Sequence, residues 1–240
     1  MYAELRARSA FSFLEGASAP EDLVAECANL GIEAVALVDT DNLSGAPRFY
    51  MAAKKLGVRP HIGAEVSAAC GGRYTLLVEN REGYQNLCRL ITSMKLRSKK
   101  GEAKASEEEF RQYARGLVCI ADGTQHFQTL LDIYGSGNVY AEIQRHLDRS
   151  EERINDRIKA QAAKWKLPVL ATNGVRYAQQ VNRKLMDVLT CVREGTSVLE
   201  AGRLLEKNSE RFIKPPEAMR RLFTTDPCAI DNALALSQRL

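Results

Sequence analysis

The chain has 240 residues and a formal net charge of +4 at neutral pH. Its 45% hydrophobic and 27% charged residues are typical of a folded, water-soluble protein, which excludes the disordered and membrane-embedded classes. The charge is too small to indicate nucleic-acid binding by itself, and the six cysteines include no C-x-x-C pair typical of a zinc knuckle. These features predict one or two domains, a cytoplasmic location, no membrane partner and, by default, a monomer.

Apolar stretches of strand length alternate with longer amphipathic stretches along most of the chain. This alternation is typical of βα units around a parallel sheet or barrel. The predicted strands are Ala3–Arg8, Ala34–Asp39, Arg59–Ser67, Tyr74–Glu79, Leu117–Ala121, Val139–Ile143 and Pro168–Thr172.

The helices between these strands are predicted from their end signals. The first has a capping box of Ser18 and Glu21, Pro20 in its first turn and Gly31 at its end. The others are expected at Gly45–Leu56, Gly83–Leu96 and Ser150–Lys166.

Two segments lack this alternation. Arg97–Glu107 has no apolar periodicity and is predicted to be a surface loop. After Gln179 the strands stop, so we predict a barrel over residues 1–178 and a helical extension over residues 179–240. The helices expected in the extension are Asn182–Arg193, Val198–Lys207, Pro216–Phe223 and Pro227–Arg239.

Candidate site residues lie where the predicted strands end, because barrels of this kind build their sites at the C-terminal ends of strands. Arg6 and Arg8, two apart on the first strand, project from one face. Glu65 follows Gly63-Ala64 on the third strand, and His146 follows the sixth.

Five segments carry a resemblance to a known family. They are Ser9-Ala-Phe-Ser-Phe-Leu-Glu-Gly-Ala-Ser18, Gly63-Ala-Glu65, Asn80-Arg-Glu-Gly-Tyr-Gln-Asn-Leu-Cys-Arg-Leu-Ile91, Glu142-Ile-Gln-Arg-His-Leu147 and Asp187-Val-Leu-Thr-Cys-Val-Arg-Glu194. In this order, and over nearly the whole chain, they resemble the PHP (polymerase and histidinol phosphatase) domain of bacterial error-prone DNA polymerases of the replicative alpha-subunit (C-family) type. The resemblance implies an α/β fold, a distorted (β/α)7 TIM-like barrel with a C-terminal helical extension.

The resemblance also implies partners and a cofactor for a complete polypeptide. These are polymerase domains of the same chain, DNA, a sliding clamp and mutagenesis proteins, with magnesium for nucleotidyl transfer during translesion synthesis. No cofactor is expected in this domain itself.

Family members with an intact site hold two or three divalent metals at the barrel mouth with histidines and carboxylates. At those positions this sequence has Arg6, Arg8, Glu15, Thr40, Glu65, Thr75, His146, Gly174 and Arg176. Arginine has only N–H donors and stays protonated, threonine is a weak ligand, and glycine has no side chain. Only Glu15, Glu65 and His146 retain ligand atoms, so we predict that metal-assisted phosphoester hydrolysis is lost and that this domain alone is inactive.

Several hypotheses follow for this degenerate site. In the first, Arg6, Arg8 and Arg176 pair with Glu15 and Glu65 and replace the metal charge, so that the barrel has a structural role. His146 is then a buried, hydrogen-bonded histidine. In the second, one metal on Glu15, Glu65 and His146 supports a phosphoesterase or 3′ to 5′ exonuclease.

A third hypothesis is a binding module without turnover. It uses the arginine-lined mouth for a phosphate of DNA or a nucleotide, or the Arg97–Lys104 loop for DNA or a partner protein.

Overall fold

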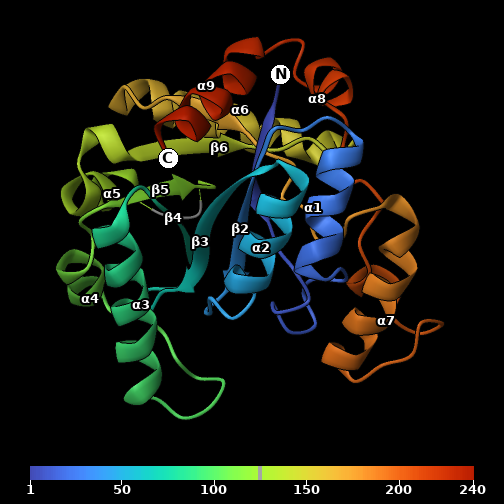
Figure 1. The fold of residues 1–240 in the computed structure, drawn as a ribbon, viewed down its shortest axis with the longest axis horizontal. Coiled ribbons are helices and arrows are strands. Elements are labelled where there is room, and N and C mark those ends of the chain that lie inside the picture. Colours follow the sequence, from blue (N-terminus) through green and yellow to red (C-terminus); the bar gives the residue numbers. More distant parts are fainter. Residues whose placement is uncertain (124–125) are drawn as a thin grey trace.

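The computed structural model describes residues 1–123 and 126–240. Its described part contains a curved seven-stranded sheet in the order β1 to β7, with helices packed around it (Figure 1). The predicted strands are confirmed, with ends shifted by a few residues at most. They are β1 (Ala3–Ala7), β2 (Ala34–Thr40), β3 (Arg59–Ser67), β4 (Arg73–Val78), β5 (Leu117–Ala121), β6 (Val139–Ile143) and β7 (Val169–Ala171).

The sheet is mixed, whereas the alternating pattern suggested parallel strands throughout. β1, β2 and β3 are parallel, β4 runs antiparallel to both neighbours, and β5, β6 and β7 are parallel again. Only residues 68–72 join β3 to β4, with Gly71 and Gly72 in the left-handed region. So short a connection makes a hairpin, because a parallel crossover needs a dozen or more residues.

The chain returns to β1 after β7 and narrows the opening of the barrel on that side. Val175 bridges to Ala7, with the Arg8 N–H donating to the Val175 carbonyl at 2.9 Å and the Val175 N–H donating to the Arg6 carbonyl at 2.8 Å. The segment after β7 therefore lies directly beside the end of β1.

Nine α-helices are present in the described residues. They are α1 (Pro20–Asn29), α2 (Ala46–Leu56), α3 (Arg81–Leu96), α4 (Glu107–Gln112), α5 (Phe127–Tyr134), α6 (Arg149–Trp165), α7 (Arg183–Glu194), α8 (Pro216–Leu222) and α9 (Pro227–Arg239). Short 3-10 turns are η1 (Ser136–Asn138), η2 (Gln180–Asn182) and η3 (Gly202–Leu204). The helices α4 and α5 were not predicted from the sequence.

Two helix predictions were wrong. Ser18 does not cap α1, because its hydroxyl accepts the Ala178 N–H at 2.8 Å; the cap residue is Ala19, whose N–H bonds to Asp22 at 3.2 Å. The helix expected over Val198–Lys207 is reduced to η3, since Leu199 is 97% exposed and the segment has no continuous apolar face to dock.

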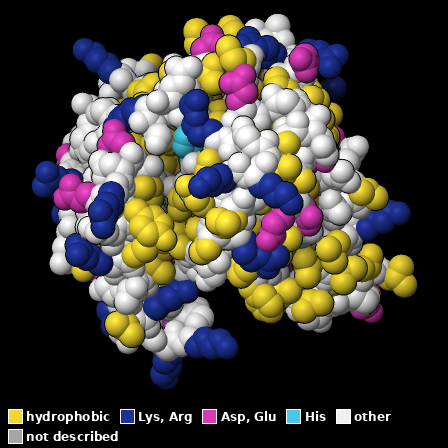
Figure 2. All heavy atoms as spheres, in the orientation of Figure 1, with side chains coloured by type: hydrophobic (Ala, Val, Ile, Leu, Met, Phe, Trp, Pro, Cys, Tyr) yellow, Lys and Arg dark blue, Asp and Glu magenta, His cyan; other side chains and the backbone are white. Residues whose placement is uncertain are grey.

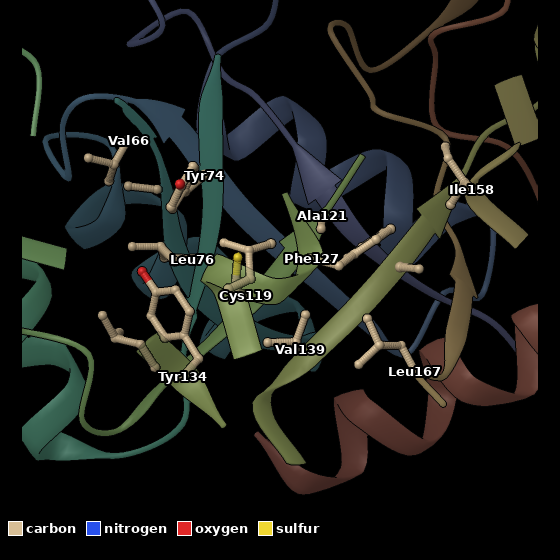
Figure 3. Packing of buried hydrophobic residues seen from close by; sticks show 14 of the residues in the cluster. Val66, Tyr74, Leu76, Cys119, Ala121, Phe127, Tyr134, Val139, Ile158 and Leu167 are labelled. Carbon is tan, nitrogen blue, oxygen red and sulfur yellow. The ribbon is translucent and has the colours of Figure 1, made fainter. Parts of the chain in front are cut away.

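The core has an outer and an inner layer. On the outside of the sheet, Leu76, Cys119 and Val139 pack with Phe127 and Tyr134 of α5 (Figure 3). The inner layer comprises Leu5 of β1, Val38 of β2, Leu77 of β4, Ile120 of β5 and Leu170 of β7, with Ala233 and Leu236 of α9. The last helix therefore belongs to the barrel's own core.

Replacing Leu236 with alanine is expected to lower the free energy of unfolding by about 2 to 5 kcal/mol, because it leaves a cavity between α9 and the strands. Urea unfolding measures the change. Leu199→Ala, in an almost fully exposed side chain, is the control and should change stability by less than about 0.5 kcal/mol. Equal effects of the two substitutions would contradict the docking of α9.

The contact between β3 and α9 should make stability depend on pH. The buried His61 ring bonds through Nε2 to the Ser237 hydroxyl at 2.8 Å. Burial, with the nearby Arg59 charge, lowers the pKa of His61 from 6.5 to about 4. Because the unfolded chain binds this proton more readily, stability should fall by about 3 kcal/mol as pH drops from 6.5 to 4.

His61→Gln should flatten that part of the pH profile in urea unfolding. An unchanged slope between pH 6.5 and 4 would show that His61 is not the titrating group.

Basic and hydrophobic side chains gather at different places on the face of the molecule that Figure 2 shows. The predicted Arg97–Glu107 loop is confirmed up to Ser106, and Figure 2 shows Lys and Arg side chains spread around it at the lower left. Hydrophobic side chains instead gather over η2 and α7, where Val181 of η2 and Leu185 and Val192 of α7 are exposed (Figure 2). None of the described helices is long and apolar enough to cross a bilayer.

Candidate functional site

The centre of the barrel mouth is an arginine held between two glutamates. Arg6, at the end of β1, donates through Nε to Glu65 of β3 at 2.8 Å and through Nη1 to Glu142 of β6. Arg8 projects from the same face and donates through Nη2 to the other oxygen of Glu65. These strand ends meet at one opening of the curved sheet, so residues far apart in the sequence form one ionic cluster.

The charges of this buried cluster strongly shift one another's pKa. Burial alone would raise the pKa of Glu65, but Arg6 and Arg8 outweigh it and lower the pKa to about 2. Burial alone would lower the pKa of Arg6, but the charges of Glu142 and Glu65 outweigh it and raise the pKa well above its usual value. Both oxygens of Glu65 already accept charge-assisted hydrogen bonds, so their lone pairs are engaged by guanidinium groups.

Glu15 pairs with a residue that the sequence did not single out. Arg73, the first residue of β4, donates to Glu15 through Nη2 at 2.6 Å, and the Thr40 hydroxyl donates to it at 3.1 Å. The pKa of Glu15 is lowered, with burial opposed mainly by Arg73. The expected pairing of Glu15 with Arg6, Arg8 or Arg176 is therefore corrected: its partner in the structure is Arg73.

The loop that carries Glu15 is fixed by a buried carboxylate at the end of β2. Asp39 accepts the Ser9 N–H at 2.8 Å, the Ser9 hydroxyl at 2.8 Å and the Ser12 hydroxyl at 2.7 Å. The loop between β1 and α1 is thus held over the mouth by three hydrogen bonds to one side chain.

His146 is buried with both ring nitrogens engaged. Nε2 faces the Asn173 carbonyl at 2.8 Å, and Nδ1 faces a Glu151 carboxylate oxygen at 2.6 Å. A nitrogen that faces a carbonyl oxygen must carry a proton, so Nε2 offers no lone pair to a metal. The His146 ring thus links the end of β6 to Asn173 in the segment after β7.

Two predicted positions, Thr75 and Gly174, offer a metal only a weakly ligating hydroxyl and no side chain, respectively. Thr75 is buried on β4, directly opposite Glu65 in the antiparallel register. Gly174 has a φ of +53°, and a Cβ there would lie 2.7 Å from the Gln144 Nε2 and 3.0 Å from the Arg211 Nη1.

Gly174→Ala should therefore lower the free energy of unfolding by about 1 to 2 kcal/mol, because it combines a left-handed backbone with a crowded Cβ. Thermal unfolding measures the shift. Gly137→Ala is the control, since nothing lies within 4 Å of a Cβ at that position. A harmless Gly174→Ala would show that the mouth has room there for a side chain.

Arg176 was expected to pair with Glu15 or Glu65, and this expectation is also corrected. It donates through Nη1 to Glu206 at 2.6 Å, and Arg211 approaches the same oxygen through Nε at 3.5 Å. Glu206 and Arg211 belong to the segment between η3 and α8, and no motif in the sequence marked either of them.

These side chains line a pocket of about 460 Å³ at the barrel mouth. Its charged lining comprises Arg6, Arg8, Glu65, Arg73, Asp122, Glu142, Glu151, Arg176 and Arg211. Within the described ranges 1–123 and 126–240, no group of three His, Cys, Asp or Glu side chains is arranged to hold a metal ion. The residues present do not fit a multi-metal centre, because five guanidinium groups face the carboxylates.

Comparisons with known proteins agree with the fold. Residues 4–167 match the PHP domain family. The chain is 39% identical, over 94% of its length, to an error-prone DNA polymerase of Anaeromyxobacter sp. (strain K), of which it covers 21%. It is 36% identical, over 97% of its length, to an error-prone DNA polymerase of Rhodopseudomonas palustris (strain BisB5), of which it covers 22%. The chain thus spans about a fifth of the length of these relatives.

Solved structures show the same fold at low sequence identity. A two-domain protein with a predicted PHP-like metal-dependent phosphoesterase from Bacteroides vulgatus has a TM-score of 0.54 at 14% identity, over 96% of this chain and 63% of that chain. An amidohydrolase from Chromobacterium violaceum has a TM-score of 0.53 at 14% identity, over 74% of this chain and 88% of that one. The match over residues 4–167 shows that this chain belongs to the PHP domain family.

Proposed function

We propose that this chain is the N-terminal PHP domain of an error-prone DNA polymerase and that its barrel has a structural role there. The observation that carries the proposal is the buried Glu65, whose two carboxylate oxygens are bonded by Arg6 and Arg8. Guanidinium groups supply the positive charge that metal ions supply in an intact site, and they cannot activate water.

The proposal includes the context of the complete polypeptide. The relatives that match nearly the whole chain are named error-prone DNA polymerases, and each is several times longer. In this proposal, polymerase domains of the same polypeptide bind DNA and use magnesium in the cytoplasm, with a sliding clamp and mutagenesis proteins as partners. Residues 1–178 form the barrel, and residues 179–240 form an extension whose last helix, α9, completes the barrel core.

An assay of metal response tests the structural role. Thermal unfolding and the release of nucleotide from a primer 3′ end are measured with EDTA, manganese or zinc. We expect the same unfolding temperature in all three and no metal-dependent release, because arginines engage Glu15 and Glu65, and Glu151 and Asn173 engage His146. A metal-stimulated activity that is lost in Glu65→Gln but kept in the exposed-site control Arg115→Ala would refute the proposal.

A further inference from the structure

Exposed hydrophobic side chains gather on one helix and on the segments that flank it. Seven of the sixteen large hydrophobic side chains exposed in the described residues lie within the 24 residues from 181 to 204. They are Val181, Leu185, Val188, Val192, Val198, Leu199 and Leu204, on η2, α7, η3 and the connection between α7 and η3. Figure 2 shows this surface at the lower right, where Figure 1 places α7. Hydrophobic side chains exposed singly are ordinary, but a contiguous patch marks an interaction site.

The amphipathic pattern of α7 is inverted relative to that of an ordinary surface helix. Leu185, Val188 and Val192 lie on one face of the helix, and all three are exposed. Toward the rest of the protein, the helix turns a largely buried ion pair of Arg183 and Asp187, at 2.6 Å, and Arg183 also donates to two backbone carbonyls of the segment after η3. A surface helix turns its apolar face to the core and its charges to water. The inversion therefore indicates that another apolar surface covers the outward face.

The inward packing of α7 is small. Met186 is its largest buried side chain and packs with Tyr177 and Ala17 in a satellite cluster that is separate from the barrel core. The other buried side chains of the helix, Thr190 and Cys191, are short. Helices in proteins gain most of their stability by packing an apolar face, and the larger apolar face of α7 points outward. The helix therefore reaches its full packing only when a second surface covers it.

The spacing and the charges of α7 favour an aliphatic helix as the covering surface. The exposed aliphatic side chains of the outward face are three and four residues apart, which is the spacing of a seam along which a second helix packs. Four charged groups of α7 already form ion pairs, Arg183 with Asp187 and Arg193 with Glu194. A covering helix need not compensate these charges.

We propose that the outward face of α7, with η2 and η3, is the docking surface for an aliphatic helix of the polymerase domains of the same polypeptide. The inference rests on the proposed function and names the surface through which the barrel fulfils its structural role. The matched relatives have about four fifths of their length outside the stretch that this chain covers, so the proposed polypeptide carries a large second body. A tethered partner is present at high effective concentration and needs no charges to steer it, which agrees with an aliphatic face.

Thiol modification of the complete polypeptide tests the docking surface. Val188→Cys places a thiol at the centre of the face, and Leu96→Cys, at the exposed end of α3, is the matched control. Maleimide labelling is followed by peptide mass spectrometry, which separates these thiols from the native cysteines. Val188→Cys should react at least about tenfold more slowly in the complete polypeptide than in the 240-residue chain, because a covered thiol reacts only when the contact opens. Leu96→Cys should react at similar rates in both.

A charge on the same face gives an independent test. In the complete polypeptide, Val188→Asp should raise the labelling of a Leu185→Cys thiol about tenfold, because an apolar contact cannot solvate a carboxylate. Val188→Ile, which stays aliphatic, should leave that labelling unchanged. Equal labelling of Leu185→Cys with valine or aspartate at position 188 would contradict the docking.

The possible outcomes separate this surface from the proposed function. Equal labelling of Val188→Cys in the two proteins would overturn the docking surface and leave the proposed function intact. A complete polypeptide without nucleotidyl transfer would refute the proposed function and, with it, the named partner. Protection of Val188→Cys that appears in the 240-residue chain and grows with its concentration would show that a second copy covers the face, and would also overturn the proposal.

Discussion

Replacing Arg6 with alanine is expected to lower the free energy of unfolding by about 3 to 5 kcal/mol. The substitution removes an arginine partner from Glu142 and from Glu65, and both carboxylates are buried. An uncompensated buried charge is costly, because the protein interior cannot solvate it as water does. Urea unfolding at neutral pH measures the loss.

Arg115→Ala is the matched control, because its pair with Glu82 is highly exposed and should contribute less than about 1 kcal/mol. An Arg6→Ala protein as stable as this control would show that Glu65 and Glu142 have another source of compensation. It would remove the main physical support for charge replacement.

Replacing Arg145 with alanine is expected to lower the free energy of unfolding by about 3 kcal/mol. Arg145 follows β6 and is buried, with Nε 2.8 Å from Glu152, Nη2 2.7 Å from Asp226 and Nη1 3.1 Å from the Leu222 carbonyl. Its guanidinium also lies 4.9 Å above the ring of Phe223. One side chain thus joins the barrel to the connection between α8 and α9.

Arg145→Lys keeps the charge but loses the planar fork, so it should be of intermediate stability in the same urea measurement. If lysine were as stable as arginine, the charge alone would account for the contact. If alanine were as stable as arginine, the link between the barrel and the last helices would lie elsewhere.

The strands and the centre of the site were accessible from the sequence because both depend on local patterns. Buried apolar runs define the strands, and the curvature of the sheet brings Arg6 and Arg8 of β1 against Glu65 of β3, two strands away. The rule that sites lie at the C-terminal ends of strands located these residues. The rule holds for the parallel strands of the sheet.

The same rule missed Arg73, because β4 runs antiparallel and presents its first residue at the mouth. Glu206 and Arg211 escaped prediction for another reason: their segment reaches the mouth through a tertiary bridge between Tyr177 and Phe212. The prediction that Ser18 caps the first helix was wrong because its hydroxyl accepts a hydrogen bond from the Ala178 N–H, in the segment after β7. In each case the partner lies far away in the sequence.

The most direct test of the central claim is the metal content per chain. The protein is purified without a metal-affinity tag, offered manganese, zinc and iron, and examined by elemental analysis. The arginine-filled mouth predicts a value near zero for all three metals. A stoichiometric metal that is lost in Glu65→Ala or His146→Ala would contradict charge replacement and favour a metal-dependent phosphoesterase or exonuclease.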